Sequence, residues 1–148
     1  HAQSYDKLPK LMKIAVESAD AVIHAGDFVT EECYTGFVEA SKAFYGVRGN
    51  NDFFDIPEQQ TLDIDGLKIA VIHGHQARGA WENWLEYRFA KFQPNIIIFG
   101  HTHTPYLQTF SGVTLLNPGS VTRRRMTAYH SYAIIDTISK KAEITAID

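Results

Sequence analysis

Ile96-Ile97-Ile98-Phe99-Gly100-His101-Thr102-His103 is the segment around which this 148-residue chain is predicted to be organised. Its apolar run follows Pro94-Asn95 and is too short for a helix, which indicates a buried strand. Open α/β sheets bind ligands beyond the carboxyl ends of their strands, so His101 and His103 are candidate ligands. Two loop histidines are more often surface or hydrogen-bonding residues, so the metal hypothesis depends on the other strand ends.

Composition is that of one ordinary globular domain over residues 1–148, with 45% apolar and 21% charged residues. The formal net charge of −3 gives no electrostatic footprint for nucleic acid, so no specific nucleic-acid partner is expected. No apolar run approaches the length of a membrane span, and no membrane partner is expected. The single cysteine, Cys33, cannot form an internal disulfide, which favours a reducing, cytoplasmic compartment.

Three further apolar runs are predicted strands, and each is followed by residues that can bind a metal. Run 21–25 leads to Gly26-Asp27, run 43–47 to Arg48-Gly49-Asn50-Asn51-Asp52, and run 67–72 to His73-Gly74-His75. As alternatives, Asp27 caps the following helix and the Gly-Asn-Asn-Asp sequence is ordinary turn chemistry. These alternatives explain the residue types, but not why each of these strands ends in a possible ligand.

Helical spacing of apolar residues predicts helices over about 8–19, 31–41 and 80–92. Asp65-Gly66 and Ser111-Gly112 predict hairpin turns between short strands. Strands that alternate with helices favour an α/β fold.

A sheet would gather the candidate ligands along one edge. They are Asp27, Asn50, His73, His101 and His103. Mixed nitrogen and oxygen ligands suit Mn²⁺, Fe²⁺, Co²⁺, Ni²⁺ or Zn²⁺ better than Ca²⁺ or Mg²⁺ alone. A carboxylate that can bridge suggests two ions about 3.5–4 Å apart, which would hold a hydroxide nucleophile and neutralise charge on a phosphoryl group. Arg123-Arg124-Arg125 is interpreted as a solvated basic patch, with a guide for anionic substrates as the alternative.

The order of these motifs resembles that of the calcineurin-like metallophosphoesterase superfamily. The matching residues are Gly26-Asp27, Gly49-Asn50-x-Asp52, His73 and Gly100-His101-x-His103. The length, His73-Gly74-His75-Gln76 and Asn117-Pro118-Gly119-Ser120 narrow the resemblance to the small phosphodiesterase family that also contains the retromer scaffold subunit. The likeness spans essentially the whole chain and implies a two-sheet α/β sandwich flanked by helices, with a dinuclear site at the strand ends.

The resemblance also implies a role for each site residue. Asp27 would bridge two divalent ions, with Mn²⁺ expected and Ni²⁺, Fe²⁺, Co²⁺ or Zn²⁺ as alternatives. Asn50, His73 and His101 would complete one metal site, and His1 and His103 would belong to the other. Asp52 would orient its neighbours by hydrogen bonding.

Two features depart from the family pattern. The family opens with a strand ending in Asp-x-His, and His1 matches that histidine, so the strand and its Asp are expected before residue 1.

Many superfamily enzymes carry histidine at the position of Asn51, where it protonates the leaving group. Asparagine cannot act as a general acid at neutral pH, so His75, a water or the substrate must supply the proton. Activated aryl phosphodiesters are therefore expected to be the easiest substrates.

The sequence thus predicts a metal-dependent phosphodiesterase that acts on a small phosphodiester. The competing hypothesis is a protein-interaction scaffold like the retromer subunit. The ligand-type residues favour the enzyme, and a homo-oligomer stays an open alternative.

Overall fold

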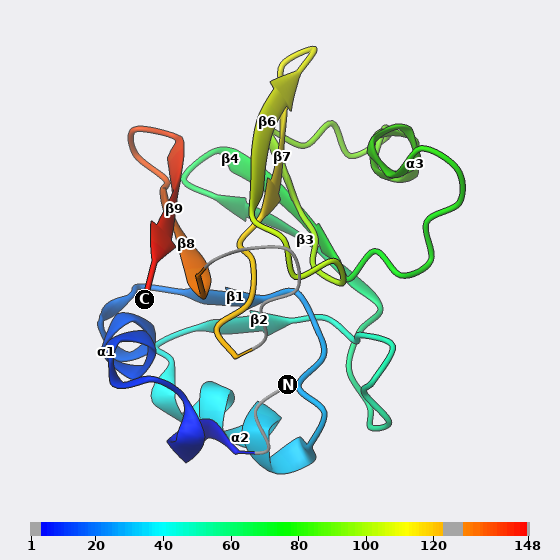
Figure 1. Cartoon of the computed structure of the whole chain (residues 1–148). Coiled ribbons are helices and arrows are strands. Elements are labelled where there is room, and N and C mark those ends of the chain that lie inside the picture. Colours follow the sequence, from blue (N-terminus) through cyan, green and yellow to red (C-terminus); the bar gives the residue numbers. More distant parts are fainter. Residues whose placement is uncertain (1–3, 123–128, 148) are drawn as a thin grey trace.

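The computed structural model describes residues 4–122 and 129–147, so the predicted ligand His1 and the patch Arg123-Arg124-Arg125 lie outside the described residues. Helices and strands alternate along the chain, as predicted for an α/β protein (Figure 1). The described helices are α1 (Lys10–Ser18), α2 (Glu31–Ala40) and α3 (Trp81–Arg88), with a 3-10 turn at Tyr5–Lys7. The described strands are β1 (Val22–His24), β2 (Phe44–Gly46), β3 (Gln59–Ile64), β4 (Leu67–Ile72), β5 (Ile96–Ile98), β6 (Tyr106–Phe110), β7 (Val113–Asn117), β8 (Ser131–Asp136) and β9 (Lys141–Ala146).

The largest sheet has five strands in the order β3-β4-β5-β7-β6. Strands β4, β5 and β7 run parallel, and β3 and β6 pair antiparallel at the two edges. Val71 is level with Ile98 in the pairing of β4 with β5, and the Gly100 N–H still donates to the His73 carbonyl beyond the strand ends (2.9 Å). This register carries His73 and the Gly100–His103 loop to the same edge of the sheet.

A second layer of strands packs against one face of this sheet (Figure 1). It consists of the parallel pair β1-β2 and the antiparallel pair β8-β9, which are separate hydrogen-bonded sheets among the described residues. Side chains alternate along β4, so Ile69 and Val71 point into the core between the layers together with Ile23 and Ile144. The architecture is therefore the expected two-layer sandwich, with a second layer made of two strand pairs.

Helices cover both outer faces of the sandwich. Helices α1 and α2 lie beneath β1-β2 (Figure 1), where Val16 and Phe37 belong to the same core cluster as Val22. Helix α3 covers the other face of the five-stranded sheet through Leu85, which packs with Ile97. The longest described helix has 10 residues, whereas a membrane-spanning helix needs about 20, so no described helix is long and apolar enough to cross a membrane.

The expected extent of the third helix, 80–92, was wrong, because α3 ends at Arg88. Tight turns follow, with the Ala90 N–H bonded to the Tyr87 carbonyl, and the chain reverses at Gln93, whose φ is +54°. The residue before a proline disfavours the helical region, so Pro94 requires the helix to stop before Gln93.

Candidate active site

Asp27 lies in the loop after β1 and is only 5% exposed. The Asn51 backbone N–H donates to Asp27 Oδ1 (2.9 Å), and the Asn51 side-chain amide donates to Oδ2 (3.1 Å). Both Asp27 and the preceding Gly26 have positive φ, +65° and +103°, which turns the carboxylate back over the strand ends. The loop after β2 therefore fixes the orientation of the carboxylate on the loop after β1.

Asp52 connects the same two loops through hydrogen bonds to their backbone. Its buried carboxylate accepts hydrogen bonds from the backbone N–H groups of Asp27, Val29 and Gly49, each at 2.8 Å. Hydrogen bonds to an ionised acceptor are stronger than neutral ones. The Asp52 side chain thus binds the backbone of the loops that carry Asp27 and Asn50, and so fixes the conformation of both loops.

Glycine is required where these two loops touch. A Cβ atom on Gly49 would collide with the Oδ1 atom and the backbone nitrogen of Asp27. A Cβ on Gly26 would lie 2.7 Å from His73 Nδ1 and 2.8 Å from the Gly49 nitrogen. The glycines that precede Asp27 and Asn50 therefore allow a backbone approach that no other residue permits.

His73 continues the inward-facing row of β4 and is 1% exposed. Its Nδ1 lies 2.7 Å from the Ala25 carbonyl oxygen. On the other side of the ring, Nε2 lies 3.0 Å from Asn50 Oδ1 and 3.4 Å from Asp27 Oδ2. The ring therefore joins the sheet to both loops of the second layer.

His101 approaches the same amide oxygen from the loop after β5, with its Nδ1 3.1 Å from Asn50 Oδ1. His101 and His103 have φ values of +64° and +61°, a conformation that L-residues adopt at a cost. The buried Asn117 side chain at the end of β7 holds this loop by donating to the Gly100 carbonyl and to Thr102 Oγ1, both at 3.0 Å.

The chemistry of these atoms fits a divalent cation. The Ala25 carbonyl can only accept, so His73 Nδ1 carries a hydrogen. In the charged ring, Nε2 donates to the oxygens of Asn50 and Asp27; in the neutral ring, its lone pair faces those oxygens and acceptors meet acceptors. A second ring proton or a metal ion resolves this contact. Among the described residues, His, Cys, Asp and Glu side chains alone form no metal-binding group of three, so the set depends on the Asn50 amide oxygen.

Two pKa values in the site depart from their usual range. Burial acts to raise the pKa of the Asp27 carboxyl, but the hydrogen bond and charge of His73 and the hydrogen bonds from Asn51 outweigh it and hold this pKa well below its usual range. Burial, reinforced by the charge of His73, lowers the pKa of His75. The charge of Arg48 acts weakly in the same direction on the pKa of His75.

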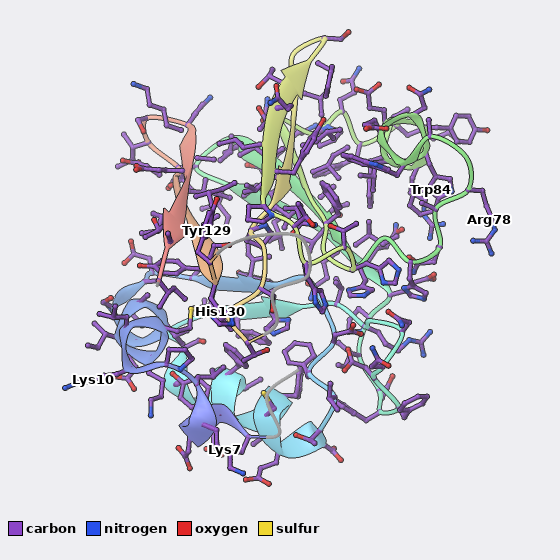
Figure 2. The ribbon with its side chains drawn as sticks, in the orientation of Figure 1. Lys7, Lys10, Arg78, Trp84, Tyr129 and His130 are labelled. Atoms are coloured by element: carbon purple, nitrogen blue, oxygen red, sulfur yellow. The ribbon has the colours of Figure 1, made fainter. Side chains whose placement is uncertain are left out.

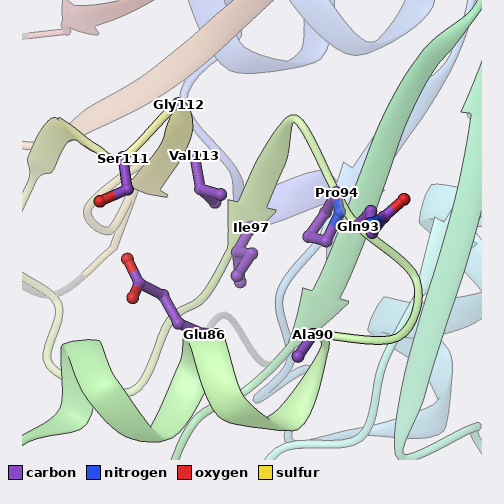
Figure 3. Close-up of a pocket in the computed structure, with 8 residues that line it drawn as sticks. All are labelled: Glu86, Ala90, Gln93, Pro94, Ile97, Ser111, Gly112 and Val113. Atoms are coloured by element: carbon purple, nitrogen blue, oxygen red, sulfur yellow. The ribbon is translucent and has the colours of Figure 1, made fainter.

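A cavity of about 260 Å³ opens beside these residues, lined by His75, His101 and Trp81 among others. A larger cavity of about 350 Å³ lies between α3 and the β6-β7 turn, where Ile97 and Val113 point into it (Figure 3). None of the candidate ligands lines the larger cavity. The two cavities lie at opposite ends of β5, and only the smaller one is at the carboxyl end.

The structure thus brings together four of the predicted ligands, namely Asp27, Asn50, His73 and His101. His103 is buried two residues beyond His101, and His75 lies beside His73 with ring centroids 5.4 Å apart. Sequence reasoning missed Asn117 as the residue that holds the histidine loop. No signal in the sequence marked this role, because Asn117-Pro118-Gly119-Ser120 has the composition of an ordinary turn. Sequence reasoning also did not place Trp81 at the site.

Comparisons with known proteins identify the family of this chain. A family model described as the calcineurin-like phosphoesterase superfamily domain matches residues 1–140. The protein named Probable metallophosphoesterase MJ0623 of Methanocaldococcus jannaschii is 33% identical over 123 residues, covering 80% of this chain and 63% of that protein. The chain therefore spans less than two thirds of that relative.

Two further relatives cover nearly the whole chain. Phosphodiesterase MJ0936 of the same organism is 28% identical, with 95% of this chain and 92% of the relative aligned. The crystal structure of Vps29 complexed with Zn²⁺ from Entamoeba histolytica has a TM-score of 0.77 at 20% identity, covering 100% of this chain and 92% of the other, which shows a shared fold. With a family match over almost its entire length, this chain belongs to the calcineurin-like phosphoesterase superfamily.

Proposed function

We propose that the protein is a metal-dependent phosphodiesterase with two divalent ions at the ends of β1, β2, β4 and β5. The observation that carries the proposal is the convergence of His73 Nε2 and His101 Nδ1 on one amide oxygen, Asn50 Oδ1, at 3.0 and 3.1 Å. The family membership and the 28% identity to a phosphodiesterase support the same conclusion.

One metal ion would be held by Asn50, His73 and His101, and Asp27 would bridge it to a second ion near His103. His1, outside the described residues, is proposed for the second ion by family resemblance. Bound divalent ions supply Lewis-acid charge for the phosphoryl oxygens and activate a water for attack. Mn²⁺ is the proposed metal, because the mixed nitrogen and oxygen donors suit it and its first-row neighbours.

The chain's own groups place and orient these ligands. Asp52 fixes the backbone of the Asp27 loop, and Asn51 fixes its carboxylate. Since both Asn51 donors are directed at Asp27, Asn51 is a positioning residue and not a proton source for the leaving group. The proposed enzyme therefore acts best on phosphodiesters whose leaving group departs without a proton.

The alternative function is a protein-interaction scaffold of the same fold. Likeness to the Vps29 structures at 20% identity or less shows the fold alone, so it does not favour this alternative. The four converging side chains favour the enzyme, because a scaffold needs no such set.

The test is hydrolysis of bis(4-nitrophenyl) phosphate by metal-stripped protein with Mn²⁺ or Ni²⁺ added back. We expect turnover to return with metal, and His73→Ala and Asp27→Asn to abolish it. Asp55→Asn is the matched control, because Asp55 is exposed on the loop that follows Asp52. Wild-type protein that binds Mn²⁺ but hydrolyses no phosphodiester would refute the proposal, and partner binding that survives Asp27→Asn would then support the scaffold.

A further inference from the structure

We propose that the cavity beside His75 binds an aromatic group of the phosphodiester, with Trp81 as the stacking surface, an inference that rests on the proposed function. Trp81 is the first residue of α3, and neither the family match nor the relatives assign it a role. The proposal narrows the substrate class to phosphodiesters that carry a planar aromatic group.

The cavity adjoins the candidate metal site, with which it shares His101. His75, His101 and Thr102 line one part of it, and Trp81, Leu85 and Phe99 line another. The His101 ring lies 5.2 Å from the His73 ring, and Asn50 Oδ1 lies between their nitrogens. A phosphoryl group at these ligands would therefore place one of its ester groups at the mouth of the cavity.

The aromatic wall of the cavity is held rigid by its neighbours. The Trp81 and Phe99 rings are 4.8 Å apart with an interplanar angle of 36°, and Tyr106 meets Trp81 edge-on at 4.8 Å and 81°. Contacts of this kind fix the orientation of a ring. Little conformational entropy is then lost when a ligand stacks on that ring. Apolar walls with a few placed polar groups are typical of small-molecule sites.

The volume matches part of a substrate. Drug-sized ligands occupy pockets of about 300–1,000 Å³, whereas an apolar cavity of about 150 Å³ already takes a benzene ring. The observed 260 Å³ therefore accommodates one aromatic ring with a substituent, and not a large ligand.

His75 adds a polar side chain to the lining of the same cavity. A few polar groups among apolar walls are typical of sites that bind a small molecule in one orientation.

The larger cavity does not compete for this role. It lies at the amino end of β5, where Glu86 points toward Ser111 across its opening (Figure 3). A carboxylate at that position repels a phosphodiester anion, and no candidate metal ligand is within reach of the cavity lining.

Binding is tested with two phosphoryl anions that cannot be hydrolysed, phenylphosphonate and methylphosphonate, on Mn²⁺-loaded full-length chain. The chain has two tryptophans, so Trp84→Phe leaves Trp81 as the only tryptophan emitter. We expect phenylphosphonate to quench the fluorescence of Trp81 and to bind at least about tenfold more tightly than methylphosphonate. Stacking of a ring on an aromatic side chain generally strengthens binding by about that factor. Equal affinity for the two anions would overturn the proposal.

Trp81→Leu should abolish the preference for phenylphosphonate, measured by calorimetry, and Trp81→Phe should retain most of it. Trp84→Leu is the matched control, because Trp84 lies on the same helix (Figure 2) but packs against Arg88 and does not line the cavity. A preference that survives in a folded Trp81→Leu variant would also overturn the proposal.

Turnover of bis(4-nitrophenyl) phosphate, measured in parallel, separates the two hypotheses. Turnover without a phenyl preference would refute the cavity proposal and leave the proposed function standing. A phenyl preference without turnover of any phosphodiester would refute the proposed function and support the cavity as an aryl phosphoryl site.

Discussion

Replacing Asp52 by asparagine should destabilise the protein and weaken metal binding together, although Asp52 is not itself a proposed ligand. Its carboxylate accepts three buried backbone N–H bonds, from Asp27, Val29 and Gly49. Oδ2 accepts two of these bonds and Oδ1 accepts the third. An amide keeps only one of the two oxygens, so its NH₂ group must face one of these N–H donors.

The magnitude follows from this geometry. In the better amide orientation the oxygen faces Asp27 and Gly49, and the bond to Val29 is lost. A hydrogen bond to a charged acceptor is worth about 1.5–3 kcal/mol and one to a neutral acceptor about 1 kcal/mol, so one bond is lost and two are weakened. The sum is about 2.5–7 kcal/mol, a large part of the 5–15 kcal/mol that stabilises a typical domain.

Urea unfolding followed by circular dichroism measures this loss, with an unchanged m-value showing that only stability has changed. Asp55→Asn removes the same charge from an exposed position in the same loop and should shift stability by less than about 0.5 kcal/mol. Calorimetry should show weaker Mn²⁺ binding for Asp52→Asn, because Asp27 loses its backbone anchor. A fall in stability below about 1 kcal/mol with unchanged Mn²⁺ affinity would refute the argument that Asp52 holds the site together.

Three shorter predictions concern other parts of the site. Burial, the largest of several causes, lowers the pKa of His24 to about 3 from the unfolded value of 6.5. Between these pH values only the unfolded chain binds the proton, so stability falls by up to about 1.4 kcal/mol per pH unit as the pH falls, and His24→Asn should flatten the acid limb of a pH series of urea melts. Gly49→Ala forces a methyl group into Asp27, so it should abolish Mn²⁺ binding by calorimetry even where far-ultraviolet circular dichroism shows a folded chain. Arg48→Ala should raise KM for an anionic phosphodiester several-fold at low salt and leave kcat nearly unchanged. The control is Arg78→Ala, which should change neither constant, because the Arg78 side chain projects away from the molecule (Figure 2).

The strand ends were predictable because two independent patterns coincide there. Apolar runs such as 67–72 and 96–99 are followed at once by glycine or histidine, and the parallel register of β4 and β5 makes them meet at one edge. The hairpin at Asp65-Gly66 was equally readable, and the structure confirms it with φ values of +54° and +81°. Local chemistry and sheet topology agree in these segments.

What the sequence did not reveal is set by long-range contacts. Asn117 reads as part of an ordinary Asn-Pro-Gly-Ser turn, and only the packing of β7 beside β5 shows that its amide reaches Gly100 and Thr102. Trp81 lies at helical spacing with the core residues of α3, so periodicity cannot tell a buried ring from one that lines a cavity. Such roles depend on which neighbours the fold supplies, and a local pattern carries no information about them.

Residues with a strained backbone are concentrated in the loops that carry candidate ligands. Eight non-glycine residues of the described part of the chain have positive φ. Four of them, Asp27, Val29, His101 and His103, lie in the loops after β1 and β5, which carry three of the candidate ligands. The other four lie in turns, whereas Val29 is β-branched and has no turn to justify its φ of +73°. Each strained residue costs about 1–3 kcal/mol, and such residues persist only where the surroundings over-determine them.

The strained residues are held in place by hydrogen bonds, with Asp52 for the loop after β1 and with Asn117 for the loop after β5. Both sets join groups of the protein itself, and they hold the two loops in their strained form. A site preorganised in this way binds an ion without first ordering its loops. If the proposed metal binds beside Asn50 Oδ1, the stability of these two loops should therefore affect its affinity as much as the ligands do.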